Sequence, residues 1–473
     1  MLPSASSMAA NGTSQVPLNL QLGWPTPRLT AREGLLQGAE EGLAEGSNMA
    51  PVLLYGPNKG HPPLCDSLAS WLSAVYKPSA GPSEASRICI TNGASASLAN
   101  ITMKFADPTY TRRVFMVEPT YFLACPIFED CGFQGKLRGI PEGLHDGIDL
   151  HFLRAKLEEA ESENGWSARP LAKTGPNYPH IYRYVLYCTT TYSNPSAKTM
   201  PIQIREELVE MARKFDMLLI SDDVYDFLGW SVDERSKSSP FPAPPRLVDI
   251  DRSLPECTKY GNVVSNGSFA KVIGPGIRVG WVEGTASLVS CLGLVGSSSS
   301  GGAPSHFAST LVDRMLRNQS LQEHIQNILI PEYRRRSQVL TWAIENQLLP
   351  LGYQIEATGP APGLAGGYFT YIRVPSFFTQ HRVFAKTLAG IALQDYRLRI
   401  AFGHMFVVAG DESSKTRAEE DTGFAYCLRL SWSWLEAEQI AEAIDRLAKC
   451  TIDVRARVEA GEDVSKGIEI GIR

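Results

Sequence analysis

Residues 264–281 read VSNGSFAKVIGPGIRVGW. The stretch begins with apolar and small residues, and a single lysine, Lys271, follows among uncharged neighbours. A Gly-Pro-Gly turn comes next, and Arg278 then precedes a second apolar segment. If Lys271 is buried, its neutral amine is favoured, because the loss of hydration penalises the charged form. A neutral amine is a nucleophile that can form an imine with an aldehyde.

Arg278 adds a fixed cation beyond a turn that can fold the chain back towards the lysine. An amine for an aldehyde and a cation for a phosphate together suggest that the chain binds pyridoxal 5′-phosphate. The alternative is a buried lysine stem in a glycine-rich loop, with Arg278 as an ordinary surface charge.

The whole stretch closely resembles the signature of the class I and II aminotransferases, which are fold-type I pyridoxal-phosphate enzymes. In that family S-x-[SA]-K, a Gly/Pro turn and R-x-G-W carry the Schiff-base lysine and a phosphate-binding arginine. The resemblance implies that Lys271 forms the internal aldimine and that Ser268 and Arg278 contact the phosphate. It also implies an α/β fold, with a large domain whose mostly parallel central sheet is flanked by helices. A smaller α+β domain would be built from both chain ends.

Bulk composition is typical of soluble globular proteins, with 44% hydrophobic and 20% charged residues. A chain of 473 residues is long for one core, so we expect two domains. The formal net charge of −5 gives no basic field, so we expect no nucleic-acid partner. No apolar run approaches the ~20 residues that a membrane span needs, so we expect no membrane association.

The first residues and the cysteines suggest where the protein works. Residues 1–17 have neither the charged nor the apolar region of a secretory signal, and we interpret them as a disordered leader. Nine cysteines lack C-x-x-C spacing, which argues against a disulfide framework or a zinc site and fits reduced thiols. We therefore expect a cytoplasmic enzyme without a metal ion.

The resemblance also divides the chain. The expected parts are an N-terminal arm with part of the small domain at 18–55, a large cofactor-binding domain at 56–318, an interdomain helix at 319–347 and the C-terminal small domain at 348–473. Two stretches depart from a compact family member. We interpret the Ser/Pro-rich insertion at 229–262 as a surface loop, and residues 409–422 as a charged, turn-rich loop.

A candidate anion site follows the expected strand Arg87–Thr91. A small-residue loop leads into a helix expected over Leu98–Phe105, so free backbone N–H groups and the helix dipole would face an anion. Such loops also occur without any ligand. Because the resembled family holds its phosphate here, the N–H groups of Ala94 and Ser95 are candidates, together with the Ser95 hydroxyl.

Two carboxylates end the buried-type strand Met217–Ile220. Asp222 matches the family's D-x-x-Y aspartate, which pairs with the pyridine nitrogen, and Tyr225 the phenol beside the cofactor's oxygen. A carboxylate favours a protonated ring nitrogen through an opposite-charge effect of ~1–3 pKa units, which makes the ring an electron sink. We interpret Asp223 as a solvated or capping neighbour.

Two further residues follow strand ends. Tyr121 occupies the place of the family's P-x-Y ring, which stacks on the pyridine and adds about 0.5–1.5 kcal/mol beyond area burial. Core packing by this aromatic pair, with Phe122, is the alternative. Asn194 matches the N-P-[SGT] asparagine, which bonds the cofactor's phenolic oxygen and the substrate carboxylate. Without the resemblance, Asn-Pro indicates only a turn.

Two N-terminal residues are assigned by resemblance alone. Tyr55 lies in a string like L-x-Y-G-x-x-x-G-x-x-x-L, whose tyrosine reaches the cofactor phosphate of the neighbouring subunit. The active site would then require a homodimer, whereas the alternative for Tyr55 is packing. Gly23 lies in QLGWPT and matches an arm glycine that covers the substrate; a linker is the alternative.

Arg429 stands inside the apolar segment Tyr426–Trp432, where an unpaired cation is costly. One interpretation is a salt bridge to a structural carboxylate. The resemblance implies instead an R-L-S-[WF] arginine that forms a two-pronged pair with the substrate α-carboxylate. Such charged hydrogen bonds contribute about 1.5–3 kcal/mol each, and planar carboxylates suit arginine.

The predicted function is an aminotransferase that moves an amino group between an L-amino acid and a 2-oxo acid through Lys271. An alternative is a β-eliminating lyase, either a C–S lyase or an aminocyclopropanecarboxylate-synthase-like enzyme, since both begin with the same chemistry. A cofactor-binding regulator fused to a DNA-binding module is disfavoured, because about 20 residues before the arm are too few for that module. Trp24, Tyr368 and Phe369 point to an apolar or aromatic substrate pocket, and the sequence leaves the amino acid open.

Overall fold

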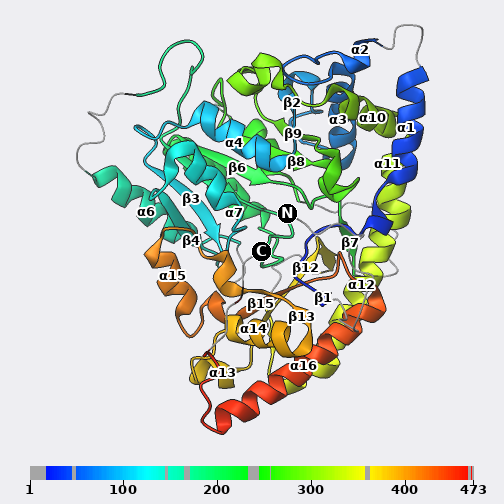
Figure 1. Ribbon diagram of the computed structural model, residues 1–473. Coiled ribbons are helices and arrows are strands. Elements are labelled where there is room, and N and C mark those ends of the chain that lie inside the picture. Colours follow the sequence, from blue (N-terminus) through cyan, green and yellow to red (C-terminus); the bar gives the residue numbers. More distant parts are fainter. Residues whose placement is uncertain are drawn as a thin grey trace.

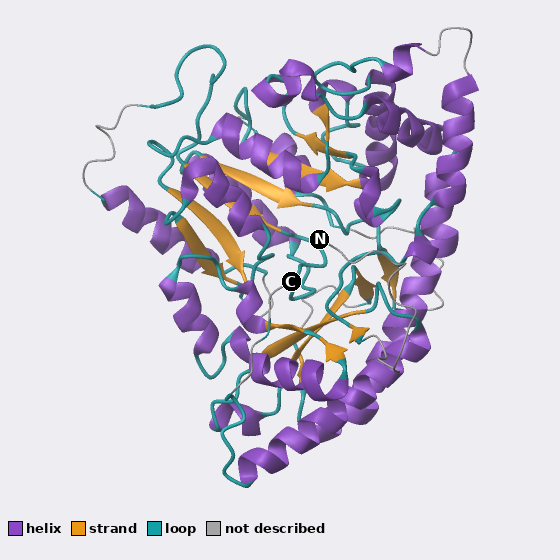
Figure 2. Cartoon of the chain, viewed as in Figure 1, coloured by secondary structure: helices purple, strands orange, loops and turns teal. Residues whose placement is uncertain are grey.

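Two sheets of different construction organise the molecule, the larger in the upper left of Figure 1 and the smaller below it. The computed structural model describes residues 17–44, 50–143, 147–163, 171–232, 244–255, 257–356, 363–466 and 470. Of the expected leader, residues 1–16 lie outside the described residues. Figure 2 shows helices packed around both sheets, which is the α/β class predicted from the sequence.

The larger sheet has seven strands in the order β2-β9-β8-β6-β5-β3-β4. Strand β9 is antiparallel to both neighbours and every other pair is parallel, which confirms the prediction of a mostly parallel sheet. Parallel strands covered on both faces are nearly continuous apolar runs, as in β5 and the first four residues of β6. The strands are β2 (Ile88–Thr91), β3 (Arg113–Glu118), β4 (Leu137–Pro141), β5 (Tyr184–Cys188), β6 (Met217–Asp222), β8 (Val263–Ser268) and β9 (Gly280–Glu283).

Helices cover both faces of this sheet, and side-chain alternation decides which strand residues meet them. Val185, Tyr187, Leu218 and Ile220 pack with α4, α5 and α9, whereas the residues between them pack with α6, α7 and α8. These and the neighbouring helices are α3 (Pro62–Tyr76), α4 (Ala94–Phe105), α5 (Ala124–Phe128), α6 (Leu150–Ser162), α7 (Ile202–Lys214), α8 (Leu247–Ser253), α9 (Ala286–Leu292) and α10 (His306–Arg317).

The smaller sheet is antiparallel, in the order β10-β12-β15-β14. Next to it, β1 pairs with β13, so an N-terminal segment joins the C-terminal part of the chain, and β7 pairs with β11. The strands are β1 (Leu18–Asn19), β7 (Gly229–Ser231), β10 (Gln354–Ile355), β11 (Leu364–Gly366), β12 (Phe369–Arg373), β13 (Leu398–Arg399), β14 (Ala401–Phe402) and β15 (Cys427–Ser431). The helices of this part are α13 (Ser376–Gln380), α14 (Ala385–Tyr396), α15 (Glu412–Glu419) and α16 (Ala437–Glu459).

A helical run along the right side of Figure 1 connects the two parts. It consists of α11 (Ser320–His324), α12 (Ile330–Ala343) and π turns at Ile325–Leu329 and Ile344–Leu348. This run overlaps the range 319–347, where an interdomain helix is expected, and Pro331 lies just after the first π turn, where the run departs from the α-helical hydrogen-bond pattern. Two helices precede it in the chain, α1 (Arg32–Ala44) and α2 (Ala50–Leu53). Across the described ranges, no helix has the length and apolar character that a membrane crossing requires.

Both loop predictions are wrong in part. Residues 409–422 contain helix α15, whose buried positions are Ser414 and Ala418, and such small residues create no apolar periodicity. The insertion at 229–262 contains β7 and α8, while its residues 233–243 and 256 lie outside the described residues. Strand β7 was missed because its partner, β11, is far away in the sequence.

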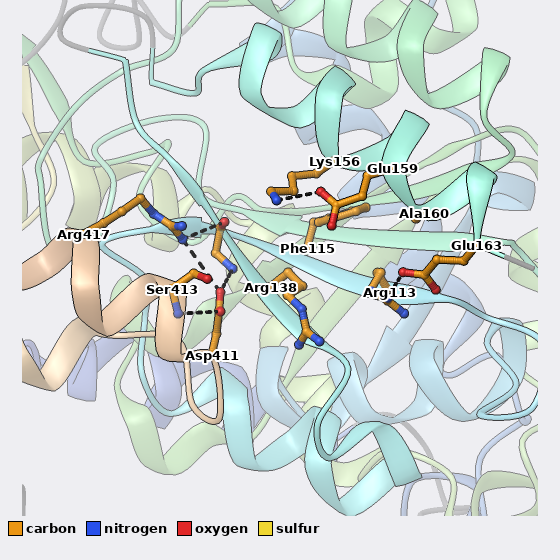
Figure 3. Close-up of a pocket in the computed structure, with 11 residues that line it drawn as sticks. Arg113, Phe115, Arg138, Lys156, Glu159, Ala160, Glu163, Asp411, Ser413 and Arg417 are labelled. Carbon is orange, nitrogen blue, oxygen red and sulfur yellow. Dashed lines mark hydrogen bonds and ion pairs between the residues drawn. The ribbon is translucent and has the colours of Figure 1, made fainter.

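Helix α15 covers β4, the edge strand of the larger sheet (Figure 3). The Asp411 carboxylate accepts the N–H of Gly139 at 2.8 Å, and Arg417 donates to the Gly139 carbonyl at 3.1 Å. Arg417 also pairs with the buried Glu118. Exposed strand edges template aggregation, so these contacts protect the edge. A cavity of about 170 Å³ lies beside them, and its ion pairs include Arg113 with Glu163.

Candidate active site

Several predicted site residues meet where β6 and β8 end. Asp222 is the last residue of β6, and its register partner on β8 is Asn266. Lys271 follows β8 in the short turn Phe269–Lys271, and helix α4 starts beside this edge. The carboxyl ends of parallel strands are the usual place for a ligand in such a sheet.

Lys271 is held between aromatic rings. Its Nζ donates to the carbonyl oxygen of Gly23 at 2.6 Å and lies 5.5 Å and 5.4 Å from the ring centres of Tyr225 and Tyr368. The Tyr368 hydroxyl donates to the Lys271 carbonyl at 2.9 Å, which fixes the backbone. Burial lowers the pKa of Lys271 to about 8, with Arg429 acting in the same direction. A neutral amine is therefore accessible near neutral pH.

Asp222 is buried and has a strong hydrogen-bond donor. The hydroxyl of Tyr187 donates to its Oδ2 at 2.6 Å, and the Asn266 amide lies 3.5 Å from its Oδ1. Burial raises the pKa of Asp222 to about 6, while Tyr187 and Lys271 act against that rise. The carboxyl group is therefore mostly ionised at pH 7 and can attract a proton on a nearby ring nitrogen.

The prediction that Asp223 is solvated or a capping residue is wrong. Asp223 is buried, and its carboxylate accepts hydrogen bonds from the hydroxyls of Ser221 and Ser265. Because successive side chains of a strand point to opposite faces, the Asp223 side chain points away from the face that Asp222 shares with Lys271. Asp223 therefore belongs to the polar interior beneath the site.

The N-terminus of α4 forms a cradle with Arg278. The helix begins at Ala94, earlier than the predicted Leu98, and its N-cap Gly93 has a positive φ and no side chain to cap the first N–H groups. Arg278 donates to the Asn92 carbonyl at 2.8 Å, and a Cβ on Gly93 would lie 2.4 Å from the guanidinium. A helix N-terminus and an arginine side by side suit a phosphate.

Two other predicted cofactor contacts lie by this cradle. Ala94 and Ser95 are the first residues of α4, and Ser95 is exposed. The Ser268 hydroxyl accepts the N–H of Ala270 at 3.1 Å and so caps the turn that carries Lys271. This places Ser268 between the strand end and the lysine.

Arg429 is a buried cation. Its Nη1 donates to Asn194 Oδ1 at 2.6 Å, its Nη2 donates to the Gln21 carbonyl, and its guanidinium lies 4.2 Å from the ring centre of Phe369. Burial lowers its pKa to about 10. In the part of the chain that the structure describes, no carboxylate forms an ion pair with Arg429, and its Nε has no partner. The salt bridge considered from the sequence is therefore absent from those residues.

The predicted tyrosines divide into two groups. Tyr121 is half-buried near Asp222 and Arg429, and burial raises its pKa to about 12. Tyr225 is buried, hydrogen-bonded to Asn194 and packed edge-on against Tyr368 at 5.4 Å between ring centres. Tyr55 is 84% exposed and lies against Gly301, apart from the buried cluster in a single copy of the chain.

Sequence reasoning missed three contacts of this site. Tyr187, Asn266 and the carbonyl of Gln21 touch Asp222 or Arg429. The alternation of buried side chains in β5 and β6 was a usable signal for Tyr187, because it places Tyr187 on the face of Asp222 once the two strands are neighbours. The contact of the Gln21 carbonyl had no signal, because backbone groups carry no sequence pattern.

Comparisons with known proteins point to one family. Residues 31–353 match the family model for aminotransferase class I and II. An uncharacterized protein of Saccharomyces cerevisiae is 35% identical and covers 90% of this chain and 95% of its own length. Aromatic-amino-acid aminotransferase 1 of Thermococcus litoralis is 26% identical, over 92% of this chain and 88% of that protein. A crystal structure of the α-aminoadipate aminotransferase LysN from Thermus thermophilus, complexed with N-(5′-phosphopyridoxyl)-L-leucine, has the same fold, with a TM-score of 0.68, 22% identity and 93% coverage of both chains.

Proposed function

This chain belongs to the aminotransferase class I and II family and is a pyridoxal-phosphate-dependent aminotransferase, and we propose that Lys271, Asp222 and Arg429 form its active site. One observation carries the residue assignment. A buried arginine without a carboxylate partner in the described residues lies near a lysine whose pKa is lowered and a buried carboxyl group. Such an arrangement suits a substrate that brings its own carboxylate.

The residues present fit pyridoxal phosphate. The uncapped first turn of α4, with Ala94 and Ser95, and the guanidinium of Arg278 suit its phosphate, with Ser268 beside them. Asp222 would hold a proton on the ring nitrogen. The remaining contacts would be Tyr121 at the ring face, Asn194 and Tyr225 at the phenolic oxygen, and Lys271 at the aldehyde.

When bound, pyridoxal phosphate supplies an aldehyde for amines and a ring that withdraws electrons from the neighbouring carbon. Lys271 acts as the base that removes the proton from the α-carbon of the amino acid and returns it during transfer. Its lowered pKa suits this task, because a base must lose its own proton near the working pH. Ionised Asp222 would keep the ring nitrogen protonated throughout.

Arg429 and Asn194 bind the substrate α-carboxylate in this proposal. The Gln21 carbonyl accepts a hydrogen bond from one Nη of Arg429, and the Gly23 carbonyl accepts one from the Lys271 amine. The substrate carboxylate would replace the Gln21 carbonyl, which is the weaker partner for a cation. Gly23 would then lie over the bound substrate.

The side-chain subsite is apolar or aromatic in this proposal. Phe369 contacts the Arg429 guanidinium, and Trp24, 45% exposed, packs edge-on against Trp434 at 6.4 Å. Tyr368 holds the backbone of Lys271 in place, because Tyr368 is buried and its hydroxyl donates to the Lys271 carbonyl. An aromatic amino acid as donor and a 2-oxo acid as acceptor fit this lining, and one relative is named for aromatic amino acids.

A homodimer would complete the site through Tyr55. The exposed residues Leu53, Leu54 and Tyr55 follow one another, at 67%, 62% and 84% exposure. Three consecutive large apolar residues on a surface suggest an interface. A second copy would bury them, and Tyr55 would reach the phosphate in the neighbouring subunit.

Two broader proposals follow from the sequence. The chain would divide into the arm at 18–55, the large domain at 56–318, the connecting helix at 319–347 and the small domain at 348–473. This division is supported by the two sheets and by the pairing of β1 with β13. A cytoplasmic location is supported by the cysteines, all nine of which are free thiols.

Single amino acids added to the loaded enzyme test the function and identify the donor. The visible absorbance of the bound cofactor should shift to that of the amino form, and an added 2-oxo acid should restore it. Lys271→Ala should lose both the visible band and turnover, and retained turnover would refute the role of Lys271. Release of ammonia and pyruvate from a cysteine-derived substrate without an oxo-acid acceptor would instead favour the lyase, which the relatives named above do not support.

A further inference from the structure

Strand register brings Tyr187 and Asp222 together. Tyr187 pairs with Ile220 across β5 and β6, and Asp222 lies two residues further along β6. Because side chains alternate, Tyr187, Ile220 and Asp222 point to the same face of the sheet. This is the face covered by α4 and α5, where the cofactor cradle begins.

The contact between them is short and buried. Tyr187 is 2% exposed, and its hydroxyl donates to Asp222 Oδ2 at 2.6 Å. This bond occupies one of the two carboxylate oxygens and turns the other, Oδ1, towards Asn266. The Asn266 amide is in turn fixed by the carbonyl of Ala94 at 3.1 Å, so a chain of hydrogen bonds runs from β5 to the start of α4.

We propose that Tyr187 is a positioning residue that keeps Asp222 ionised and holds its Oδ1 in place for the ring nitrogen of the cofactor. The proposal rests on the proposed function of Asp222 and adds the group on which that function depends. Hydrogen bonds to a carboxylate stabilise its charged form, and they are strongest in a site shielded from water.

The surroundings of Asp222 leave Tyr187 as the principal stabiliser of its charge. The titratable groups around Asp222 are Tyr121, Tyr187, Cys188, Asp223, Tyr225 and Lys271. Burial and the negative charge of Asp223 favour the protonated form of Asp222, and only Lys271 and the Tyr187 hydroxyl oppose this among the groups that shift its pKa. In the loaded enzyme Lys271 is engaged with the cofactor, so the Tyr187 hydroxyl remains as the group that lowers the pKa of Asp222, with the Asn266 amide, 3.5 Å from Oδ1, as the longer contact.

Removing the Tyr187 hydroxyl should shift a proton from the ring nitrogen of the cofactor to Asp222. In Tyr187→Phe the Asp222 carboxylate becomes a stronger base, so it takes the proton that it otherwise leaves on the ring nitrogen. The 15N chemical shift of 15N-labelled pyridoxal phosphate distinguishes a protonated from an unprotonated ring nitrogen. We expect a protonated nitrogen in the wild-type protein and a shift towards the unprotonated form in Tyr187→Phe. Cofactor affinity should fall about 10-fold, as expected for one hydrogen bond to a charged group.

Tyr184→Phe is the matched control. Tyr184 lies on the same strand, is fully buried and donates to a carboxylate, Glu161, at 2.8 Å, but its side chain points to the opposite face. Tyr184→Phe should leave the 15N shift of the cofactor and the cofactor affinity unchanged. In an Asp222→Asn background, Tyr187→Phe should change the affinity less than about two-fold, because the proposed effect passes through Asp222.

The outcomes separate this proposal from the proposed function. A wild-type 15N signal of an unprotonated nitrogen would overturn the role of Asp222 itself. A protonated nitrogen in both the wild type and Tyr187→Phe would overturn only the role of Tyr187. Should Tyr187→Phe fail to fold, a 13C-labelled Asp222 carboxyl in the Lys271→Ala apoprotein decides, with its signal assigned by its loss when Asp222→Asn is added. Lys271 is then absent, so the Tyr187 hydroxyl is the group left to oppose burial and the charge of Asp223. A titration midpoint below about 7 supports the proposal, and one above about 8, as for a buried carboxyl without an effective donor, contradicts it.

Discussion

The side-chain amine of Lys271 donates a hydrogen bond to the carbonyl oxygen of Gly23, 2.6 Å away and 248 positions earlier in the chain. Arg429 donates in the same way to the carbonyl of Gln21. The short segment 21–23 thus accepts hydrogen bonds from the two cationic side chains that we assign to cofactor and substrate binding. The segment is fixed at its base, where the Leu20 carbonyl accepts the Ser431 N–H at 2.9 Å.

Gly23→Ala should disturb this segment without removing any catalytic side chain. An added Cβ would lie 2.7 Å from the ring of Phe369, so the segment must move away from the site. We expect kcat/KM to fall about 10-fold, which corresponds to about 1.4 kcal/mol, mainly through a higher KM. Gly296→Ala is the control, because its Cβ would meet no atom within 4 Å. Equal kinetics in the wild type and Gly23→Ala would contradict a role over the substrate.

Arg429 should lower the stability of the fold and contribute to binding of the amino-acid substrate. Replacing it by Met removes a buried cation that has no carboxylate partner in the described residues, so the thermal midpoint of unfolding should rise while KM for the amino acid rises about 100-fold or more. Arg336 is the matched comparison. It is also buried but is paired with Glu332 and Glu436, which are 21% and 31% exposed, so Arg336→Met should destabilise the fold by about 1–3 kcal/mol. A lower thermal midpoint in Arg429→Met would contradict this prediction and show that the hydrogen bonds of Arg429 to Asn194 and the Gln21 carbonyl outweigh the cost of burying its charge.

The rate of cofactor capture should depend on pH through Lys271. Only the neutral amine attacks an aldehyde, and burial lowers the pKa of Lys271 to about 8. The second-order rate constant for pyridoxal phosphate and the apoprotein should therefore rise with pH and level off above about 8. Stopped-flow absorbance measures it, with Lys271→Ala as the blank. A rate that still climbs towards pH 10 would indicate a solvated lysine.

Asp226 should make the fold less stable as the pH rises. Burial, together with the neighbouring Asp223, raises the pKa of Asp226 to about 8, so the folded protein keeps a proton that the unfolded chain releases above its ordinary pKa of 3.8. The free energy of unfolding should then fall between about pH 4 and 8, by at most about 1.4 kcal/mol per unit. Chemical denaturation of Asp226→Asn should show a flatter profile. The exposed Asp395 supplies the control, Asp395→Asn, and identical slopes for Asp226→Asn and the wild type would contradict the assignment.

The strands and the cofactor motifs were predictable from local sequence. Strand β5 and the first four residues of β6 are apolar runs, and Lys271, Asp222 and Asn194 lie in motifs at or just after strand ends, so short stretches determine them. The family resemblance then supplied their relation to one another. The structure places Asp222, Asn194 and Arg429 around one site, and their catalytic and binding roles stay predictions.

The remaining features depend on contacts between distant segments. The bond of Tyr187 to Asp222 requires the register of two strands, and the buried state of Asp223 requires knowledge of its neighbours Ser221 and Ser265. Helix α15 has no apolar stripe, because its interior positions are small and its ends are held by Asp411 and Arg417 at a sheet edge. Patterns within one segment cannot reveal such pairings.

The central claim is that one amine, that of Lys271, reacts with the cofactor. Borohydride reduction of the loaded protein fixes pyridoxal phosphate to the amine that holds it, and peptide mass spectrometry then identifies the residue. The account predicts a single modified peptide that carries the label on Lys271 and is absent when Lys271→Ala is treated in the same way. A label on another lysine at equal yield, or an unlabelled Lys271 in a protein that still transaminates, would contradict it.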